Sequence, residues 1–320
     1  MLPASIERAL GALAVQLPEL RRAQAGGASL EVALGRVERP DMASATILEG
    51  DDVRAIDVQR PARPVVGAFL DGVQESREVG WIGAVPIVLG RVAAVVRERD
   101  GAALRTWDAP SRREALYAPW SRLPRRVRAL VEEFGPEARE VTTEDGAHPL
   151  RAMQEATNAV KQDREALERD LAERFCATTD GVLYVDGPLP AADAVIGSAR
   201  VLGVIKSHQT MYVAGPALET VLALADGQRS SVFAIESRHR PPVASWYLRV
   251  RDPRGHGPFW GLVRVEVPRW RFESEGASIA DECSQWVLAE RAPLALPDGR
   301  WDTMAYGIRS CEEYLRAVMG

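Results

Sequence analysis

The chain has 320 residues, 46% of them apolar and 27% charged, which is ordinary for a globular protein with one large core or two small ones. The net charge of −5 argues against a basic surface that coats nucleic acid, but it allows a local basic groove beside an acidic site. Three widely spaced cysteines without a CxxC pair, no apolar run of about 18 residues and no signal-peptide pattern favour a cytoplasmic protein without disulfides, a zinc site or a membrane span.

Apolar residues at helical spacing predict a helix within residues 5–24, with Ser5 as its N-cap and a kink or an end at Pro18. The apolar positions are Ile6, Leu10, Leu13, Leu17 and Leu20. Because this helix precedes every strand, we expect residues 1–40 to form an N-terminal helical segment for docking or dimerisation. Residues 41–320 are then the main domain.

Short strands are expected in the proline-containing stretch 40–64. Residues 65–99 predict a β-meander, in which the first strand ends at Asp71 and the second is stopped by Pro86. The arginine-rich stretch 111–134 is expected to be helical in two pieces, because prolines interrupt it.

The clearest helix spans residues 151–175, where Leu167, Leu171 and Phe175 recur at every fourth position. We expect strands near 182–185, 201–205, 231–235, 244–250 and 260–267, and helices near 216–225, 277–291 and 303–318. This order predicts an α/β fold with a mixed sheet flanked by helices, in place of a regular βαβ alternation.

Two apolar runs lead into Asp-Gly steps. Val-Val-Gly-Ala-Phe-Leu precedes Asp71-Gly72, and Val-Leu-Tyr-Val precedes Asp186-Gly187. Either step alone is explained well by a turn. The pair is more informative, because both runs have the character of central strands and two such strand ends can bring two carboxylates together. Oxygen-rich sites for divalent metals are built in this way.

The helix between the two steps offers further acids. On a helical wheel, Glu168 lies about 60° from the centre of the apolar stripe, and Glu165 about 120° from it. Glu168 is therefore better placed to lie along the edge of the sheet. A solvated glutamate on a charged helix is the alternative.

Several motifs in this order resemble NurA-type DNA end-processing nucleases over about residues 65–315. They are Ala68-Phe69-Leu70-Asp71-Gly72, an acid-bearing helix, Leu183-Tyr184-Val185-Asp186-Gly187-Pro188-Leu189, Leu202-Gly203-Val204-Ile205-Lys206-Ser207 and Val263-Arg264-Val265-Glu266-Val267-Pro268. The resemblance implies a ribonuclease-H-like core and a divalent-metal-dependent deoxyribonuclease that uses two Mn²⁺ or Mg²⁺ ions. It also implies a homodimer that resects DNA ends in repair with a hexameric HerA-type ATPase translocase, by 5′-3′ exonuclease and single-strand endonuclease activity.

The resemblance also assigns roles to single residues. Asp71 matches the acid of the first strand, Asp186 the acid of the DG-x-L motif and Lys206 the lysine after the next strand. Glu168 matches the helical acid, with Glu165 as the alternative. The catalytic residues implied are Asp71, Glu168, Asp186 and Lys206, and the metal ligands implied are Asp71, Glu168, Asp186 and Glu312, with Asp302 as the runner-up for the last. The chain departs from the family at Val73, where serine is usual, and around the C-terminal ligand.

Clustered carboxylates repel one another, so several of them stay ionised together only with a cation. Two metal ions could activate a water and stabilise the leaving 3′-oxygen of a phosphodiester, with Asp71 as the bridging ligand. Lys206 is one of two lysines against 38 arginines, and it would place a point charge on the scissile phosphate; a surface lysine is the alternative.

Two other functions compete with the nuclease. One is a non-catalytic subunit that keeps a degenerate nuclease fold and docks the translocase. The other is an actin-like nucleotide phosphohydrolase, which is weakened by the lack of a convincing glycine-rich phosphate loop. Aromatic residues could stack on unpaired bases, although their strand-like surroundings favour core packing. They are Trp246, Tyr247, Trp260 and Trp270. His208 could line the site, but an exposed loop histidine is favoured.

Overall fold

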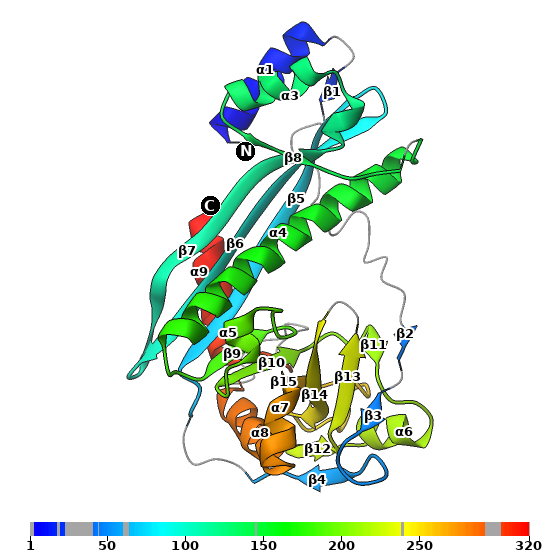
Figure 1. Ribbon diagram of the computed structural model, residues 1–320, viewed down its shortest axis with the longest axis vertical. Coiled ribbons are helices and arrows are strands. Elements are labelled where there is room, and N and C mark those ends of the chain that lie inside the picture. The colour runs from blue at the N-terminus through cyan, green and yellow to red at the C-terminus, as the bar shows by residue number, and fades with distance from the viewer. Residues whose placement is uncertain are drawn as a thin grey trace.

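A computed structural model describes residues 3–17, 20–22, 41–43, 45–59, 64–144, 146–237, 240–291 and 302–319. The molecule is elongated (Figure 1): three long strands form an upright arm, two helices sit on the tip of the arm, and a rounded body lies at its base. No helix among the described residues is long and apolar enough to cross a membrane.

The helices are α1 (Ala4–Gln16), α3 (Arg125–Glu133), α4 (Pro149–Thr178), α5 (Asp193–Ile196), α6 (Pro216–Leu222), α7 (Arg269–Glu275), α8 (Ser278–Glu290) and α9 (Tyr306–Met319), with a 3₁₀ turn at Trp120–Arg122. The strands of the arm are β5 (Ala68–Ile82), β6 (Val85–Asp100) and β7 (Ala103–Ala118), and β1 (Leu20–Arg22) and β8 (Glu137–Glu140) flank them. The body contains β2 (Asp41–Met42), β3 (Thr46–Ile47), β4 (Ala55–Asp57), β9 (Leu183–Asp186), β10 (Val201–Ile205), β11 (Thr210–Met211), β12 (Gln228–Ser230), β13 (Phe233–Ser237), β14 (Arg240–Arg249) and β15 (Leu262–Pro268).

One mixed sheet runs through both parts of the molecule. β5, β6 and β7 pair as antiparallel neighbours, and the long α4 then returns the chain to β9. β9 runs parallel to β5, and β10 runs parallel to β9, so the central order is β7-β6-β5-β9-β10. β15, β14 and β13 continue the sheet antiparallel beyond β10. The expected α/β class with a mixed sheet flanked by helices is confirmed.

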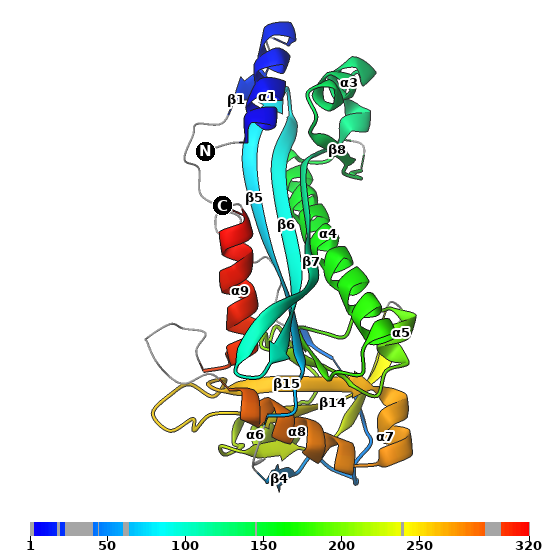
Figure 2. The ribbon, with the colours of Figure 1, turned by 90° about the vertical axis from the view of Figure 1, so that its left-hand side faces the viewer.

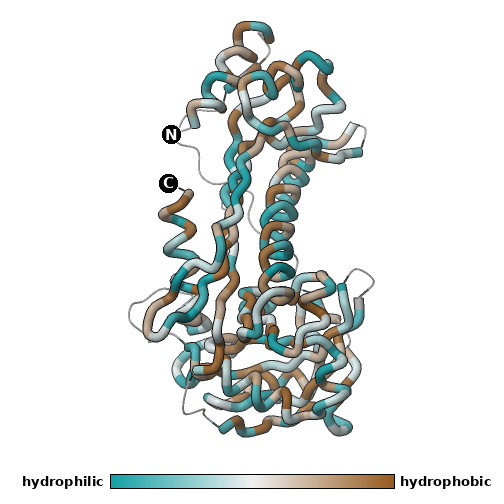
Figure 3. The backbone as a smooth tube through the Cα atoms, turned by 60° about the vertical axis from the view of Figure 1, so that its left-hand side comes forward, coloured by the Kyte–Doolittle hydropathy of each residue, from teal (hydrophilic) through white to brown (hydrophobic). Residues whose placement is uncertain are grey.

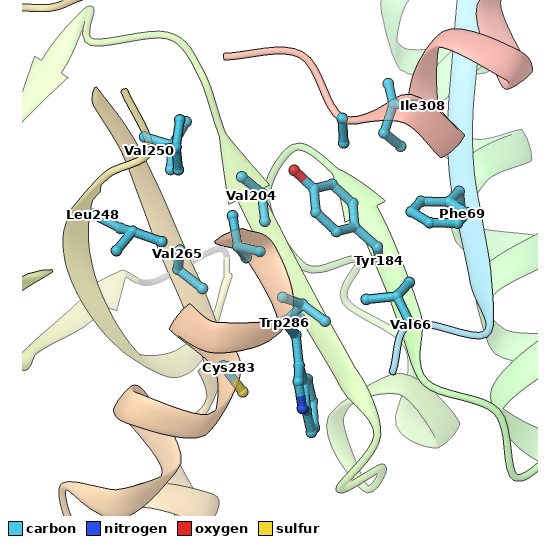
Figure 4. Packing of buried hydrophobic residues seen from close by; sticks show 14 of the residues in the cluster. Val66, Phe69, Tyr184, Val204, Leu248, Val250, Val265, Cys283, Trp286 and Ile308 are labelled. Carbon is cyan, nitrogen blue, oxygen red and sulfur yellow. The ribbon is translucent and has the colours of Figure 1, made fainter. Parts of the chain in front are cut away.

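Helices cover the two faces of the central strands. Figure 2 shows α9 and α4 on opposite sides of the arm. Side chains alternate along a strand, so Leu70 packs in the cluster of Leu171 and Phe175 from α4, whereas Phe69 packs in the cluster of Ile308 from α9. Figure 4 shows Phe69 pointing toward Ile308, with Tyr184 of β9 beside it.

The predicted helix at 151–175 is α4, and hydrophilic and hydrophobic residues alternate along it (Figure 3). Leu171 and Phe175 are fully buried, as the apolar stripe predicts. The expected strands and helices downstream of residue 182 are also present, within a few residues of their expected bounds.

The predictions for the arm were partly wrong. β5 does not end at Asp71 but continues to Ile82, because β6 pairs with it along its whole length. Pro86 does not stop a strand; it lies near the start of β6, opposite Trp81. The stretch 111–118 is not helical but belongs to β7, where tertiary pairing overrides local propensity.

The N-terminal helix lies at the tip of the arm. Ser5 is inside α1 and not its N-cap, because the helix begins at Ala4 after Pro3, and the helix ends at Gln16 before Pro18, which lies outside the described residues. The apolar side chains of α1, and that of Leu17 just after it, are buried with residues of β5, β6 and α3. The residues of α1 are Ile6, Leu10 and Leu13. A docking or dimer role for residues 1–40 stays a prediction, and residues 23–40 are outside the described part of the chain.

Gly307 lets α9 approach β5, and this contact yields a prediction. A Cβ atom at Gly307 would lie 2.2 Å from the ring of Phe69, so we expect Gly307→Ala to lower the free energy of unfolding by about 1–3 kcal/mol through overpacking. Gly11 is the matched control, because it is also helical and a Cβ there meets nothing within 4 Å. Gly11→Ala should stabilise by about 1 kcal/mol. Chemical denaturation measures both, and equal effects of the same sign would contradict this account.

Candidate active site

The register of the parallel strands brings the two predicted aspartates together. Leu70 of β5 pairs with Val185 of β9, so the next residue of each strand is Asp71 and Asp186. Asp71 lies in the middle of the sheet beside the end of β9, because β5 continues while β9 stops. The Asp-Gly pattern predicted a strand end at both aspartates. β9 does end at Asp186, whereas β5 continues past Asp71.

Lys206 comes to the same place from the third parallel strand. Val204 of β10 pairs with Asp186, and Lys206 is two residues further along, on the same face. Its Nζ lies 2.9 Å from both carboxylate oxygens of Asp186. Beyond Asp186 the chain turns at Gly187, whose φ of 133° favours glycine. The predicted neighbourhood of Asp186 and Lys206 is thus present in the structure.

Asp71 is the most buried acid of the group, with 6% of its surface exposed. Its Oδ1 accepts a hydrogen bond from the backbone N–H of Gly72 at 2.8 Å. Burial raises the pKa of Asp71 well above its usual value, and the charges of Asp186, Glu168 and Glu312 raise it further, whereas Lys206 lowers it. These five side chains therefore form one electrostatic cluster, which we call the acidic cluster.

Glu168 enters from the α4 side of the sheet. A Cβ atom at Gly72 would lie 2.3 Å from Glu168 Oε1, so the bare glycine backbone makes the space for this carboxylate. Burial raises the pKa of Glu168 from its ordinary 4.5 to about 7, against the lowering effect of Arg164, which donates a hydrogen bond to it. Glu165 is half-exposed and pairs with Arg164 at 3.7 Å and with Lys161 at 4.0 Å. The structure thus places Glu168, and not Glu165, in the acidic cluster.

The C-terminal ligand was predicted as Glu312, with Asp302 as the runner-up. Glu312 lies on α9, which is held against β5 by a hydrogen bond from Cys311 Sγ to the Phe69 carbonyl at 3.4 Å. The side chain of Glu312 is 13% exposed and forms an ion pair with Arg316 at 3.1 Å. Asp302 accepts a hydrogen bond from the backbone N–H of Gly261 at 2.7 Å. The charge of Glu312 reaches Asp71, so Glu312 is the better-placed candidate.

The oxygen donors of the acidic cluster fit a hard divalent cation in chemistry. Within the described residues, no three His, Cys, Asp or Glu side chains stand in position to hold a metal ion. The cations nearest to the acids are side chains: Lys206 binds Asp186, and Arg164 binds Glu168.

Sequence reasoning missed two residues that support the site. Arg164 bridges Glu168 and Gln74, and its spacing of four residues from Glu168 is a signal that could have revealed it. Glu266 of β15 is fully buried and accepts a hydrogen bond from the backbone N–H of Leu189 at 2.6 Å, so it fixes the chain just after Asp186. Arg240 and Arg264 each lie 2.8 Å from its carboxylate. No sequence pattern indicates that this strand residue reaches the loop.

The histidine and aromatic residues divide between core and surface. Trp246 and Tyr247 are fully buried, as core packing predicts, and Trp270 is 39% exposed. His208 is partly buried, and its Nε2 lies 2.9 Å from the Leu262 carbonyl oxygen. Burial lowers the pKa of His208, so its ring is neutral near pH 7.

Comparison with models of known protein families and with curated protein sequences found no match for this chain.

Proposed function

We propose that the protein is a divalent-metal-dependent deoxyribonuclease of the ribonuclease-H-like kind, with the acidic cluster as its active site. The observation that carries the proposal is the convergence of Asp71, Asp186 and Lys206 at three adjacent parallel strands, joined by Glu168 and Glu312 from helices on opposite faces. Perturbed carboxylates that gather from separate elements are typical of catalytic sites.

The strand order supports this reading. Three antiparallel strands, a long helix and two further strands parallel to the first lie in the spatial order 3-2-1-4-5, and this order supports a ribonuclease-H-like sheet. In this arrangement the first and fourth strands are neighbours, so the acids that they carry meet at the centre. An actin-like phosphohydrolase could share the topology, but the acidic cluster favours metal-assisted cleavage of a phosphodiester.

The chemistry divides between metal and protein. Two bound Mn²⁺ or Mg²⁺ ions would supply an activated water and stabilise charge on the leaving 3′-oxygen. Asp71, Glu168, Asp186 and Glu312 would hold them. Lys206 Nζ would leave Asp186 to meet the negative charge of the scissile phosphate, which a compact ammonium can do as a point charge.

The biological setting of the proposal follows from the NurA resemblance. The substrate is a DNA end, which the protein cleaves by 5′-3′ exonuclease or single-strand endonuclease activity. The partners are a second copy of the chain and a hexameric HerA-type translocase, and the role is DNA end resection in repair.

The test is digestion of end-labelled linear duplex and single-stranded DNA with Mn²⁺, Mg²⁺ or EDTA. We expect cleavage that needs the metal, and a loss of at least about 100-fold in Asp186→Asn and in Glu168→Gln, because ligands of this kind stabilise the transition state by several kcal/mol. Glu173→Gln is the matched control, since it changes the same residue type at an exposed position of the same helix, and it should retain activity.

Unchanged cleavage in Asp186→Asn would refute the proposed site. Tight binding of a HerA-type translocase without cleavage under any divalent ion would instead favour the non-catalytic docking subunit. The first outcome tests whether Asp186 belongs to the active site. The second tests whether the protein cleaves DNA at all.

A further inference from the structure

Two acids of the acidic cluster are each paired with a partly buried side-chain cation. Both carboxylate oxygens of Asp186 lie 2.9 Å from Lys206 Nζ, and Glu168 accepts a hydrogen bond from Arg164 Nη1. Lys206 and Arg164 each expose 19% of the side chain, so water and salt screen these two pairs little. The carboxylates that would hold a divalent ion are therefore already neutralised by the chain itself.

The other two acids of the cluster are neutralised less. Glu312 pairs with Arg316 at 3.1 Å, but the Arg316 side chain is 65% exposed, and an exposed pair of this kind is weak because solvent screens it. Asp71 accepts a hydrogen bond from the Gly72 backbone N–H, and the charge of Lys206 lowers the pKa of Asp71. Lys206 and the arginine beside Glu168 therefore supply most of the positive charge that the acidic cluster experiences.

Both cations are held in place by further contacts. Arg164 Nε donates a hydrogen bond to Gln74 Oε1 at 3.0 Å, which ties the guanidinium to β5 three residues after Asp71. Lys206 Nζ lies 4.0 Å from Met304 Sδ, in the segment before α9. A cation that is already fixed loses little conformational entropy when it pairs, so each of them is a strong competitor for its carboxylate.

These pairings account for the geometry of the acidic cluster. Four acids share one electrostatic cluster, yet within the part of the chain that the structure describes no three His, Cys, Asp or Glu side chains stand in position to hold a metal ion. A metal ion and a side-chain cation repel each other, so they bind the same carboxylate together only at a cost. We propose that Lys206 and Arg164 are built-in counterions, which compete with the divalent metal for the carboxylates of the acidic cluster.

The proposal rests on the proposed function, which it deepens by naming how metal binding to the same site is regulated. In the metal-free protein the two built-in counterions neutralise their carboxylates, and the metal binds in exchange for them. The strength of the two pairs then sets the metal concentration at which the site fills. The rival role is positioning, in which Lys206 and Arg164 hold the carboxylates ready for the metal, and it predicts an effect on metal affinity of the opposite sign.

Isothermal titration calorimetry of Mn²⁺ into the full chain tests the competition. We expect Lys206→Met and Arg164→Met each to bind Mn²⁺ about tenfold more tightly than the wild type, because each removes a positive charge close to the metal. Lys206→Arg keeps the charge and should retain the affinity of the wild type. Arg151→Met is the matched control near the start of α4, where the partner Glu144 is 78% exposed, and it should leave the affinity unchanged.

The direction of the change in Mn²⁺ affinity distinguishes competition from positioning. Weaker or unchanged Mn²⁺ binding in Lys206→Met and Arg164→Met would overturn the built-in counterions, even if Asp186→Asn abolishes DNA cleavage and so supports the nuclease. Tighter binding in both variants, in a protein that cleaves no DNA, would support the built-in counterions and refute the nuclease. Absence of Mn²⁺ binding in the wild type and in every variant would overturn both proposals.

Discussion

Replacing Asp71 with asparagine is expected to stabilise the metal-free protein while it removes DNA cleavage. Asp71 is buried among Asp186, Glu168 and Glu312, and its pKa is raised because the charged form is disfavoured in the fold. The asparagine side chain would keep an oxygen for the Gly72 N–H without the charge. We expect a higher free energy of unfolding at pH 8, because the variant no longer carries a negative charge that burial disfavours.

The stability of the metal-free protein should fall as the pH rises. A carboxyl whose pKa is higher in the folded than in the unfolded chain contributes stability below its unfolded pKa, and this contribution is lost as the pH rises through the folded pKa. For Glu168 the window runs from about 4.5 to about 7. The wild-type protein without metal should therefore lose roughly 3 kcal/mol from Glu168 across this window. Asp71 adds a loss of the same sign, which Asp71→Asn removes.

Denaturation at pH 5 and pH 8, without and with Mn²⁺, checks this prediction. Mn²⁺ should raise the melting temperature of the wild type much more than that of Asp71→Asn, because ligand binding to the folded state stabilises it. Asp163→Asn is a control that should change the free energy of unfolding in the opposite direction. Asp163 is also buried, but Tyr117 and Arg139 each hold it at 2.6 Å and its pKa is lowered, so this variant should lose stability and retain cleavage. Destabilisation by Asp71→Asn would contradict the account.

Replacing Glu266 with glutamine is expected to cost about 3 kcal/mol of stability and to loosen the chain after Asp186. Glu266 is fully buried, and the change leaves Arg264, itself 5% exposed, without its charged partner. Removing one partner of a buried ion pair costs about 3–5 kcal/mol, because the remaining charge is uncompensated. Amide hydrogen exchange at Leu189 should rise as well, since its N–H donates to Glu266 at 2.6 Å and the neutral amide oxygen of glutamine is a weaker acceptor than the carboxylate.

A surface ion pair provides the comparison for Glu266. Glu273 lies 2.9 Å from Arg269, but its side chain is 59% exposed. Exposed pairs contribute about 0–1 kcal/mol, so Glu273→Gln should be nearly neutral in urea denaturation. A loss below about 1 kcal/mol in Glu266→Gln would show that the protein relaxes around the missing charge, and it would remove Glu266 from the support of the site.

Where periodicity is strong, the sequence predicts this fold well. The stripe of Leu167, Leu171 and Phe175 identifies α4, and the short apolar runs identify β9 and β10, because both patterns are local. The arm was predicted less well, because a strand such as β7 is charged along much of its length and is set by pairing with β6. Such long-range pairing leaves little trace in a single sequence.

The candidate site was likewise predicted where the signal is local in the sequence, and missed where it depends on distant contacts. Asp71 and Asp186 could be named from the apolar runs before them, and the helical wheel predicted that Glu168 lies nearer the sheet than Glu165, as their burial shows. Glu266 could not be found, because its partner is a backbone group far along the chain, at Leu189. The resemblance to NurA-type nucleases supplied Glu312, which no local pattern indicates.

The unbroken course of β5 has a mechanical consequence. From Asp71 to Ile82 the strand extends about 36 Å, and it ends where β1 and the cluster around α1 are attached. A strand held in a ladder with β6 along this length transmits displacement better than a chain of loops would. A force applied at the tip of the arm is therefore transmitted along one continuous strand to Asp71.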